Sequence, residues 1–430
     1  MHSKERYSDS THSLPLSLRY FVFAILSLNI FSLGYSFVAR LLGAGLPYDF
    51  PYLFTPGLFF SDFNDLVGQI SLFGTPQFFT QHRFLMYPPA ALLALRLSCV
   101  TAHPSRPFLL LLLASGALFA IGFFRIMRQR GLARSSAGLL TASIAITSYP
   151  YLLLLQRGNI EVYVWLAVTF GLWSFYRGNY IWAAVCIGLA TAIKMYPFVF
   201  IGLFLPQRRY REAALSVFTA ALVSLVALRA MSSDIWYAFH WNRIQLEAFG
   251  KYYAASPNSL GYDHSFFALV KYALVRWHVD IGPAVRPYTL IMAVICVVLY
   301  FSRIWRISPV NQILALSILS VTIAPTSYDY TLLSLYAALA ILCVIAVETP
   351  AASQSRLIPF FFLFALVLTP ESYAVLDGAR LGGQLRAICL LALLVLALCK
   401  PLISGLTGAI DQGPNNLPIG SQSAESGLKP

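Results

Sequence analysis

The sequence predicts an all-α, polytopic integral membrane protein, and three features of the chain support this fold class. Of its 430 residues, 58% are hydrophobic and only 11% are charged, and the mean hydropathy is +0.69. Soluble globular domains are about 45–50% apolar and about 25% charged. Continuous apolar stretches close to the ~20 residues that cross a bilayer recur along the chain. A transmembrane barrel would show ~10-residue alternating segments instead, so we expect a bundle of about 10–12 transmembrane helices.

The charge distribution and the cysteines exclude several classes of protein. The net charge is +13, but the arginines cluster between apolar runs, where the positive-inside rule places them. We therefore expect a multi-pass protein of the inner cell membrane, in contact with the lipid bilayer and without a nucleic-acid partner. The six cysteines are scattered without a C-x-x-C motif, which predicts neither a disulfide framework nor a zinc site.

The basic residues predict which loops face the cytoplasm. We expect residues 1–17 to form a cytoplasmic tail ahead of a first span at 18–42. The span at 107–127 ends in a group of arginines, which marks the cytoplasmic side. This marker places the long loop 43–106 outside. A second long loop, 232–286, is expected on the same side.

The rest of the chain alternates between apolar runs and short polar turns. We expect one transmembrane domain over 18–404 and a disordered cytoplasmic tail over 405–430, which is rich in Gly, Pro and Ser. The further spans are expected at 136–155, 160–176, 213–231, 287–302, 308–325, 330–347, 357–374 and 385–404.

One apolar stretch lies between two basic sites, Arg177 and the run Arg208–Arg211, which both belong on the cytoplasmic side. It must therefore cross the membrane an even number of times. Lys194 and Pro197 divide it, and the first half, 181–193, reaches only ~20 Å at 1.5 Å per residue. We expect a hairpin of two short helices with Lys194 at its outer tip. The alternative is one long kinked helix with a snorkelling lysine.

Charged residues gather in the first outer loop, where charge is costly near a bilayer unless something uses or neutralises it. Asp62, Asp65, His82 and Arg83 follow the first apolar span, ahead of Tyr87-Pro88-Pro89. We interpret Asp62 as a catalytic base at the outer face. A helix N-cap is the structural alternative for Asp62, and a solvated or helix-terminal carboxylate is the alternative for Asp65.

Several short motifs follow one another in order between Asp62 and Tyr330. They are Asp62-Phe63, Tyr87-Pro88-Pro89, Arg157-Gly158-Asn159, the stretch from Gly188 to Lys194 and Pro197, Asn258-Ser259-Leu260, and Pro325 to Tyr330. In this order and spacing the chain resembles the polyprenol-phosphate-mannose-dependent glycosyltransferases of family 87, which have the GT-C architecture. The late turn departs from that pattern. Mannosyltransferases of the family carry Ser-Trp and a histidine there, so no histidine role is carried over to this turn.

The resemblance implies that a hexose, with mannose as the commonest expectation, moves from a polyprenyl-phosphate donor to a hydroxyl of a glycolipid or glycan acceptor. The reaction is expected at the outer, periplasmic side of the membrane. An alcohol loses its proton as it attacks the anomeric carbon, and the residue that matches the family's base is Asp62. One base and one displacement imply inversion of the anomeric configuration.

The departing phosphate requires cations in a poorly screened site. The donor-phosphate candidates are Lys194, Arg157, Arg83, His264 and His82. Snorkelling is the alternative for Lys194, and a hydrogen-bonded loop histidine is the alternative for both histidines. The sequence requires no cofactor and contains no metal-binding motif, and a divalent ion that bridges phosphate to Asp62 stays open.

The candidates for sugar or acceptor contact are polar residues of the outer segments. They are Asp65, Tyr87, Asn159, Asn258, Ser259 and Asp329. Helix capping is the alternative for both asparagines, and Glu161 is expected to pair locally with Arg157.

Two other classes of function compete with a transferase. A transporter or flippase of a lipid-linked sugar is expected to show internal repeats and a midplane site. We find no repeat, and the polar residues gather in the two outer loops. A non-catalytic scaffold would leave Asp62, Lys194 and Asn258 without a shared purpose. The glycosyltransferase hypothesis is therefore the preferred one, and the transporter is the alternative.

Overall fold

The computed structural model describes residues 13–42, 60–80, 87–99, 103–371, 373–376 and 379–402. Within them the protein is all-α, which confirms the predicted fold class. One short antiparallel pair interrupts the helices, in which β1 (Val375–Leu376) pairs with β2 (Ala379–Arg380).

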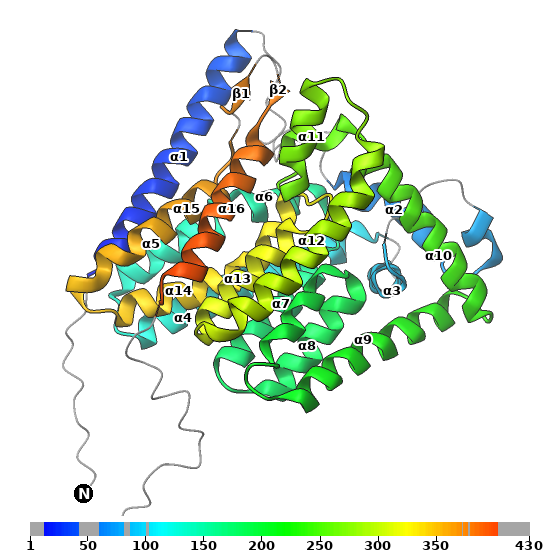
Figure 1. The fold of residues 1–430 in the computed structure, drawn as a ribbon, viewed down its shortest axis with the longest axis horizontal. Helices are drawn as coiled ribbons and strands as arrows, with labels where there is room; N and C mark the ends of the chain where they lie inside the picture. Colours follow the sequence, from blue (N-terminus) through cyan, green and yellow to red (C-terminus); the bar gives the residue numbers. More distant parts are fainter. Residues whose placement is uncertain are drawn as a thin grey trace, which may run out of the picture.

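Figure 1 shows the helices in chain order. The first part holds α1 (Leu16–Leu41), α2 (Ser61–Ile70), η1 (Pro76–Thr80), α3 (Pro89–Ser98), α4 (Ser105–Gln129), α5 (Arg134–Ala145), α6 (Tyr149–Arg157), α7 (Glu161–Tyr176), α8 (Tyr180–Ile193) and η2 (Tyr196–Leu203). The second part holds α9 (Tyr210–Met231), α10 (Ile235–Phe249), η3 (Gly250–Ala254), η4 (Pro257–Tyr262), α11 (Phe266–Arg276), α12 (Gly282–Ser302), η5 (Ile304–Arg306), α13 (Pro309–Thr322), η6 (Asp329–Leu335), α14 (Tyr336–Glu348), η7 (Ala351–Leu357), α15 (Ile358–Leu368) and α16 (Gly382–Cys399).

Seven helices of the described residues are long and apolar enough to cross a membrane, or eight if the bent pair α5 and α6 is one span. The larger number expected from the sequence counted shorter apolar helices as full spans. Two of these, α7 and α13, have 16 and 14 residues. At 1.5 Å per residue such helices reach about 21–24 Å, less than the ~30 Å hydrocarbon core. The protein is thus a multi-pass membrane protein with helices of unequal length.

The helices divide into a packed centre and an exposed periphery. Nearly every residue of α13 and α14 is buried, and both lie centrally in Figure 1. No residue of α12 is buried, and α1 and α9 expose rows of large apolar side chains, such as Phe23, Phe37 and Phe218. Because such rows are unfavourable in water, they mark the faces of the bundle that meet lipid.

The stretch that was expected to be a hairpin is broken at Lys194. Helix α8 ends at Ile193, Lys194 is extended, and the chain continues as the 3-10 helix η2, which packs back against α8. On its other side α8 lies close against α9, because a Cβ at Gly188 would come within 2.5 Å of the Ser216 carbonyl oxygen. The break places Lys194 at one end of this packed group and not in the middle of a long helix.

The described parts of the two segments expected as outer loops are largely helical. The described parts of 43–106 form α2, η1 and α3, and residues 232–286 form α10, η3, η4 and α11. Figure 1 shows α2, α3 and α10 on one side of the molecule. The Trp241 Nε1–H donates to the Phe79 carbonyl at 3.2 Å, and the Asn242 amide donates to the Tyr87 carbonyl at 2.8 Å. These bonds hold the two segments together beside the end of α6.

Candidate active site

The start of α2 is pressed against the end of α6. The Phe60 N–H donates to the Gln156 carbonyl at 2.6 Å, and Phe60 itself is left-handed, with φ of 60°. Gly158 ends α6 at φ of 63°, and a Cβ there would lie 2.9 Å from the Phe60 ring and 3.0 Å from the Cβ of Phe63. Only glycine combines this backbone conformation with this approach. The contact brings Asp62 alongside Arg157 and Asn159.

Asn159 orients the carboxylate of Asp62. Its side chain is 1% exposed, and its Oδ1 accepts the backbone N–H of Glu161 at 3.0 Å. The amide group is therefore turned outward, and Nδ2 donates to Asp62 Oδ2 at 2.9 Å and to the Tyr87 hydroxyl at 3.4 Å. The N-cap alternative for Asp62 does not hold, because Asp62 lies inside α2 and the residue before the helix makes no side-chain cap.

Arg157 lies on the other oxygen of Asp62. Its Nη1 is 3.5 Å from Asp62 Oδ1 and 3.2 Å from the Ser61 hydroxyl. The side chains of Arg157 and Asp62 are 21% and 27% exposed, so a ligand can reach both. Burial raises the pKa of Asp62 to about 6; the Asn159 hydrogen bond and Lys194 lower it, and Asp65 raises it further. A carboxyl with a raised pKa is a stronger base than a solvated aspartate.

Lys194 forms an ion pair that sequence analysis missed. Its Nζ is 2.6 Å from Glu161 Oε2, and Glu161 is fully buried. The expectation that Glu161 pairs with Arg157 is therefore wrong. The Tyr196 hydroxyl donates to the other Glu161 oxygen and lies 2.8 Å from the Ser334 hydroxyl. The lysine does not snorkel to solvent, because its partner and its ring neighbours hold it within the protein.

Tyrosines surround the two cations. The Lys194 Nζ lies 5.1 Å from the Tyr330 ring centroid and 5.9 Å from that of Tyr87. Tyr328 contacts Tyr253 and Tyr330 at 5.9 Å between ring centroids and Tyr262 at 6.2 Å. All of these tyrosines are half-buried, and four of them lie near Arg157, namely Tyr253, Tyr262, Tyr328 and Tyr330. The site is thus a polar centre with an aromatic wall.

His264 and Asp329 belong to a different, fully buried network. His264 Nδ1 lies 3.2 Å from Asp329 Oδ1, and Arg386 donates to Asp329 Oδ2 at 2.8 Å. The other His264 nitrogen is 3.1 Å from the Ser327 hydroxyl and 3.3 Å from that of Thr331. Both predicted ligands are 0% exposed. We therefore correct their predicted roles in phosphate and sugar binding, because neither side chain is accessible to a substrate.

A second buried pair lies next to this network. Lys271 Nζ is 2.8 Å from Asp263 Oδ2, and Asp263 Oδ1 accepts the backbone N–H of Ser327 at 2.9 Å. The two pairs together fix the chain from Ser327 to Thr331, which carries Tyr328 and Tyr330 into the aromatic wall. Arg386 could not be found from the motifs, because it lies more than fifty positions after the last of them.

The remaining predicted residues are placed as follows. His82 and Arg83 lie outside the described residues. Asn258 and Ser259 belong to η4, and their side chains are likewise outside the description. Asp65 is exposed one turn after Asp62. Among the side chains that the structure describes, no group of His, Cys, Asp or Glu could hold a metal ion.

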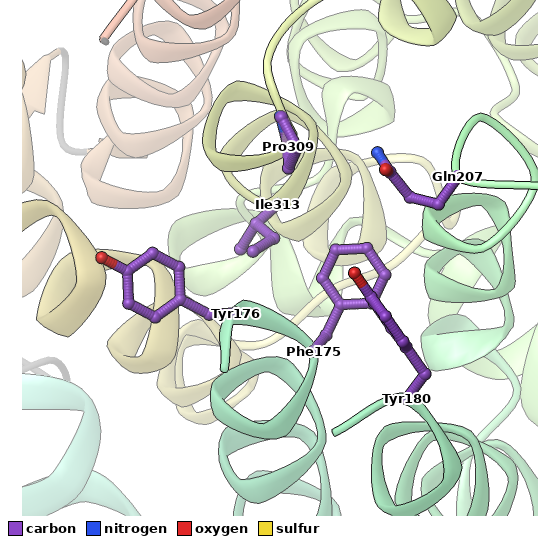
Figure 2. Close-up of a pocket in the computed structure, with 6 residues that line it drawn as sticks. All are labelled: Phe175, Tyr176, Tyr180, Gln207, Pro309 and Ile313. Carbon is purple, nitrogen blue, oxygen red and sulfur yellow. The ribbon is translucent and has the colours of Figure 1, made fainter. Parts of the chain in front are cut away.

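A small pocket lies far from this polar centre. Figure 2 shows its lining, which comes from the end of α7, the start of α8, the segment after η2 and the start of α13. Glu161 begins α7 and Lys194 follows α8, so the pocket lies at the opposite ends of these helices, roughly 20 Å away at 1.5 Å per residue. The lining residues are Phe175, Tyr176, Tyr180, Gln207, Pro309 and Ile313.

Comparison with known proteins assigns the chain to a protein family. A family model of glycosyltransferase family 87 matches residues 84–325, more than half of the chain. The matched region contains Tyr87, Arg157, Asn159 and Lys194 but begins after Asp62. In the structure Asp62 contacts Arg157 and Asn159 directly. Neither the curated proteins nor the solved structures contain a match to the chain. The protein belongs to glycosyltransferase family 87 and is a glycosyltransferase of a membrane.

Proposed function

We propose that this glycosyltransferase moves a hexose, with mannose as the expected sugar, from a polyprenyl-phosphate donor to a hydroxyl group of a glycolipid or glycan acceptor. The reaction takes place at the outer, periplasmic side of the inner cell membrane. The resemblance to polyprenol-phosphate-mannose-dependent enzymes supports the donor class. The position of the polar centre in the segments that follow the first membrane helix supports the assignment to the outer face.

The chemical step uses Asp62 as the general base. The acceptor hydroxyl gives its proton to the Asp62 carboxylate while its oxygen forms a bond to the anomeric carbon. The bond from that carbon to the phosphate oxygen breaks, and its electron pair leaves with the polyprenyl phosphate. A single displacement of this kind inverts the anomeric configuration. Asp62 then returns its proton to water.

The observation that carries the proposal is the joining of Asp62, Arg157, Asn159 and Lys194 in one centre. A base candidate with a raised pKa and two cations for a leaving phosphate lie within one group of contacts. Arginine offers two parallel donors to a phosphate and lysine offers a point charge. A phosphate is already a good leaving group, so positive charge is sufficient and a general acid is not required. We expect the reaction to require no cofactor.

The tyrosine wall gives the sugar a surface to lie on. Tyr87, Tyr328 and Tyr330 are half-buried, and Tyr87 and Tyr330 lie close to Asp62. Pyranose rings have apolar faces and polar rims, which such side chains match. We place the transferred hexose between Asp62 and this wall.

The test is a transfer assay with purified protein in lipid nanodiscs. Labelled polyprenyl phosphates that carry mannose, glucose or galactose are offered with a hydroxyl acceptor, and a labelled nucleotide sugar is offered as the comparison. We expect glycosylated acceptor and free polyprenyl phosphate from the lipid-linked donors only. Transfer from the nucleotide sugar, or movement of intact lipid-linked sugar across liposomes without transfer, would contradict the proposal and favour the transporter alternative.

A further inference from the structure

The charges of the active centre balance before any substrate is present. Asp62 faces Arg157, and Glu161 faces Lys194. A polyprenyl-phosphate sugar carries one negative charge, so its entry places three anions against two cations. Like charges that are partly removed from water repel strongly. One of the two pairs must therefore reorganise when the donor binds.

The two pairs differ in how firmly they are held. Lys194 lies 2.6 Å from Glu161, which is fully buried and also bonded by Tyr196. Removing Lys194 would leave that acid as an uncompensated buried charge, which is costly. Arg157 is 3.5 Å from Asp62, beyond normal hydrogen-bond distance, and Asp62 keeps its 2.9 Å bond from Asn159 without it. The Asp62–Arg157 pair is the one that can open at low cost.

We propose that Arg157 exchanges partners during the reaction cycle, from Asp62 in the free enzyme to the donor phosphate in the complex. The exchange gives the phosphate a bidentate partner and at the same moment takes a cation away from its place 3.5 Å from the Asp62 carboxylate, which favours proton uptake by Asp62. Arg157 thereby couples donor occupancy to base strength, and the acceptor is activated only when the donor is in place. This inference rests on the proposed function and concerns the order of events in the same site.

The exchange makes a thermodynamic prediction that a simple catalytic role for Asp62 does not make. If Asp62 and the phosphate compete for Arg157, removal of the Asp62 charge must strengthen donor binding. In Asp62→Asn we expect the Kd for the polyprenyl-phosphate donor to fall about fivefold or more. The gain must be much smaller when Arg157 is already replaced, because Asp62 and the phosphate then no longer compete for it and only their direct repulsion is relieved.

The experiment is a double-mutant cycle on donor binding to the full-length protein in nanodiscs. Kd for polyprenyl-phosphate mannose is measured for the wild type, Asp62→Asn, Arg157→Gln and the double variant. We expect tighter binding in Asp62→Asn, weaker binding in Arg157→Gln, and a clearly smaller gain from Asp62→Asn in the Arg157→Gln background. Glu247→Gln is the control, because it removes an exposed carboxylate from α10 without touching the site.

Two results would overturn the exchange. One is an unchanged or weaker donor Kd in Asp62→Asn, and the other is equal tightening with and without Arg157. If Arg157→Gln does not fold, Arg157→Lys replaces it, since lysine keeps one charge but loses the bidentate geometry, and the gain in Asp62→Asn must then shrink. Polyprenyl phosphate and inorganic phosphate serve as separate probes, and tightening for inorganic phosphate alone would also count against the exchange. Loss of turnover in Asp62→Asn with an unchanged donor Kd removes the exchange and leaves the proposed function intact.

Discussion

At the scale of single residues, the site depends on the protonation state of Asp62. Its pKa of about 6 exceeds the ~3.9 of a free aspartate. Because the base must be ionised, we expect kcat/KM to fall below pH 6 and to level off above it. The measurement is a pH–rate profile with the lipid-linked donor. A profile that is flat between pH 5 and 7 would show that Asp62 does not accept the proton in the rate-limiting step.

The same shift predicts the effect of Asp62 on stability. Between pH 3.9 and 6 the folded protein binds the Asp62 proton more tightly than the unfolded chain, so the free energy of unfolding falls as the pH rises through this interval. Above pH 6 the ionised side chain costs at most about 3 kcal/mol. We therefore expect Asp62→Asn to have an equal or higher Tm than the wild type at pH 7.5. A lower Tm would show that loss of activity in this variant reflects damage to the fold.

The Glu161–Lys194 pair predicts a second result for single side chains. Lys194→Met leaves a buried acid without its cation, and Glu161→Gln leaves Lys194 without its anchor, so each is expected to raise the donor KM about tenfold or more. If Glu161 acts only through Lys194, adding Glu161→Gln to Lys194→Met causes no further loss and restores part of the stability. Lys251→Met, at an exposed lysine of η3, is the matched control. Additive losses in KM would contradict a positioning role for Glu161.

At the scale of elements, the contact between α2 and α6 decides where Asp62 lies. In Gly158→Ala the backbone is strained at a φ of 63°, and the added Cβ lies 2.9 Å from the Phe60 ring. We expect a loss of about 2–3 kcal/mol of stability together with reduced activity. Gly178 is the matched control, because its φ is 78° but nothing lies within 4 Å of an added Cβ. Gly178→Ala is expected to cost about 1 kcal/mol and to leave activity unchanged. Equal effects of the two substitutions on activity would show that the α2 contact does not position the site.

The elements also show what the sequence could and could not predict. The break at Lys194 was predictable, because Pro197 and the short run before it exclude a full span. The Glu161–Lys194 pair was not, since the two residues lie on different helices and nothing in the sequence specifies their packing. The helices of the second outer segment were expected as a loop. Helix α10 contains several polar residues, and α11 has only 11 residues, so neither resembles a membrane span in the sequence. Asp62, Arg157 and Asn159 were each singled out, but the motifs did not predict their mutual contacts.

At the scale of the whole molecule, hydropathy established the fold class but not the interior. Helices α12 and α13 are both strongly apolar, yet α12 has no buried residue and α13 is almost wholly buried. Lipid and protein interior select the same apolar side chains, so composition does not distinguish them. The buried network of Arg386, Asp329 and His264 was misassigned for a related reason. Polar residues in an apolar chain were taken as ligands, whereas these three hold distant helices together.

This network predicts a long-range effect of the C-terminal helix. Arg386 of α16 joins Asp329 of η6 and the Thr369 carbonyl after α15. Arg386→Met leaves two buried acids, Asp329 and Glu371, without their cation, and we expect a loss of about 3–5 kcal/mol in stability. The double variant Asp329→Asn with Arg386→Met removes one of the two unpaired acids but leaves Glu371, so it is expected to recover part of that loss. Unfolding in detergent micelles measures both, and a double variant less stable than the single one would contradict this account of the network.

The central claim is that Asp62 removes the proton of the acceptor hydroxyl during transfer from a lipid-linked donor. It is tested most directly by the single-turnover rate of sugar transfer from polyprenyl-phosphate mannose at saturating donor and acceptor, for wild type and Asp62→Asn. We predict a rate at least about a hundredfold lower in Asp62→Asn, with inverted anomeric configuration in the wild-type product. A variant that transfers the sugar within about threefold of the wild-type rate, less than any general base contributes, would contradict the claim.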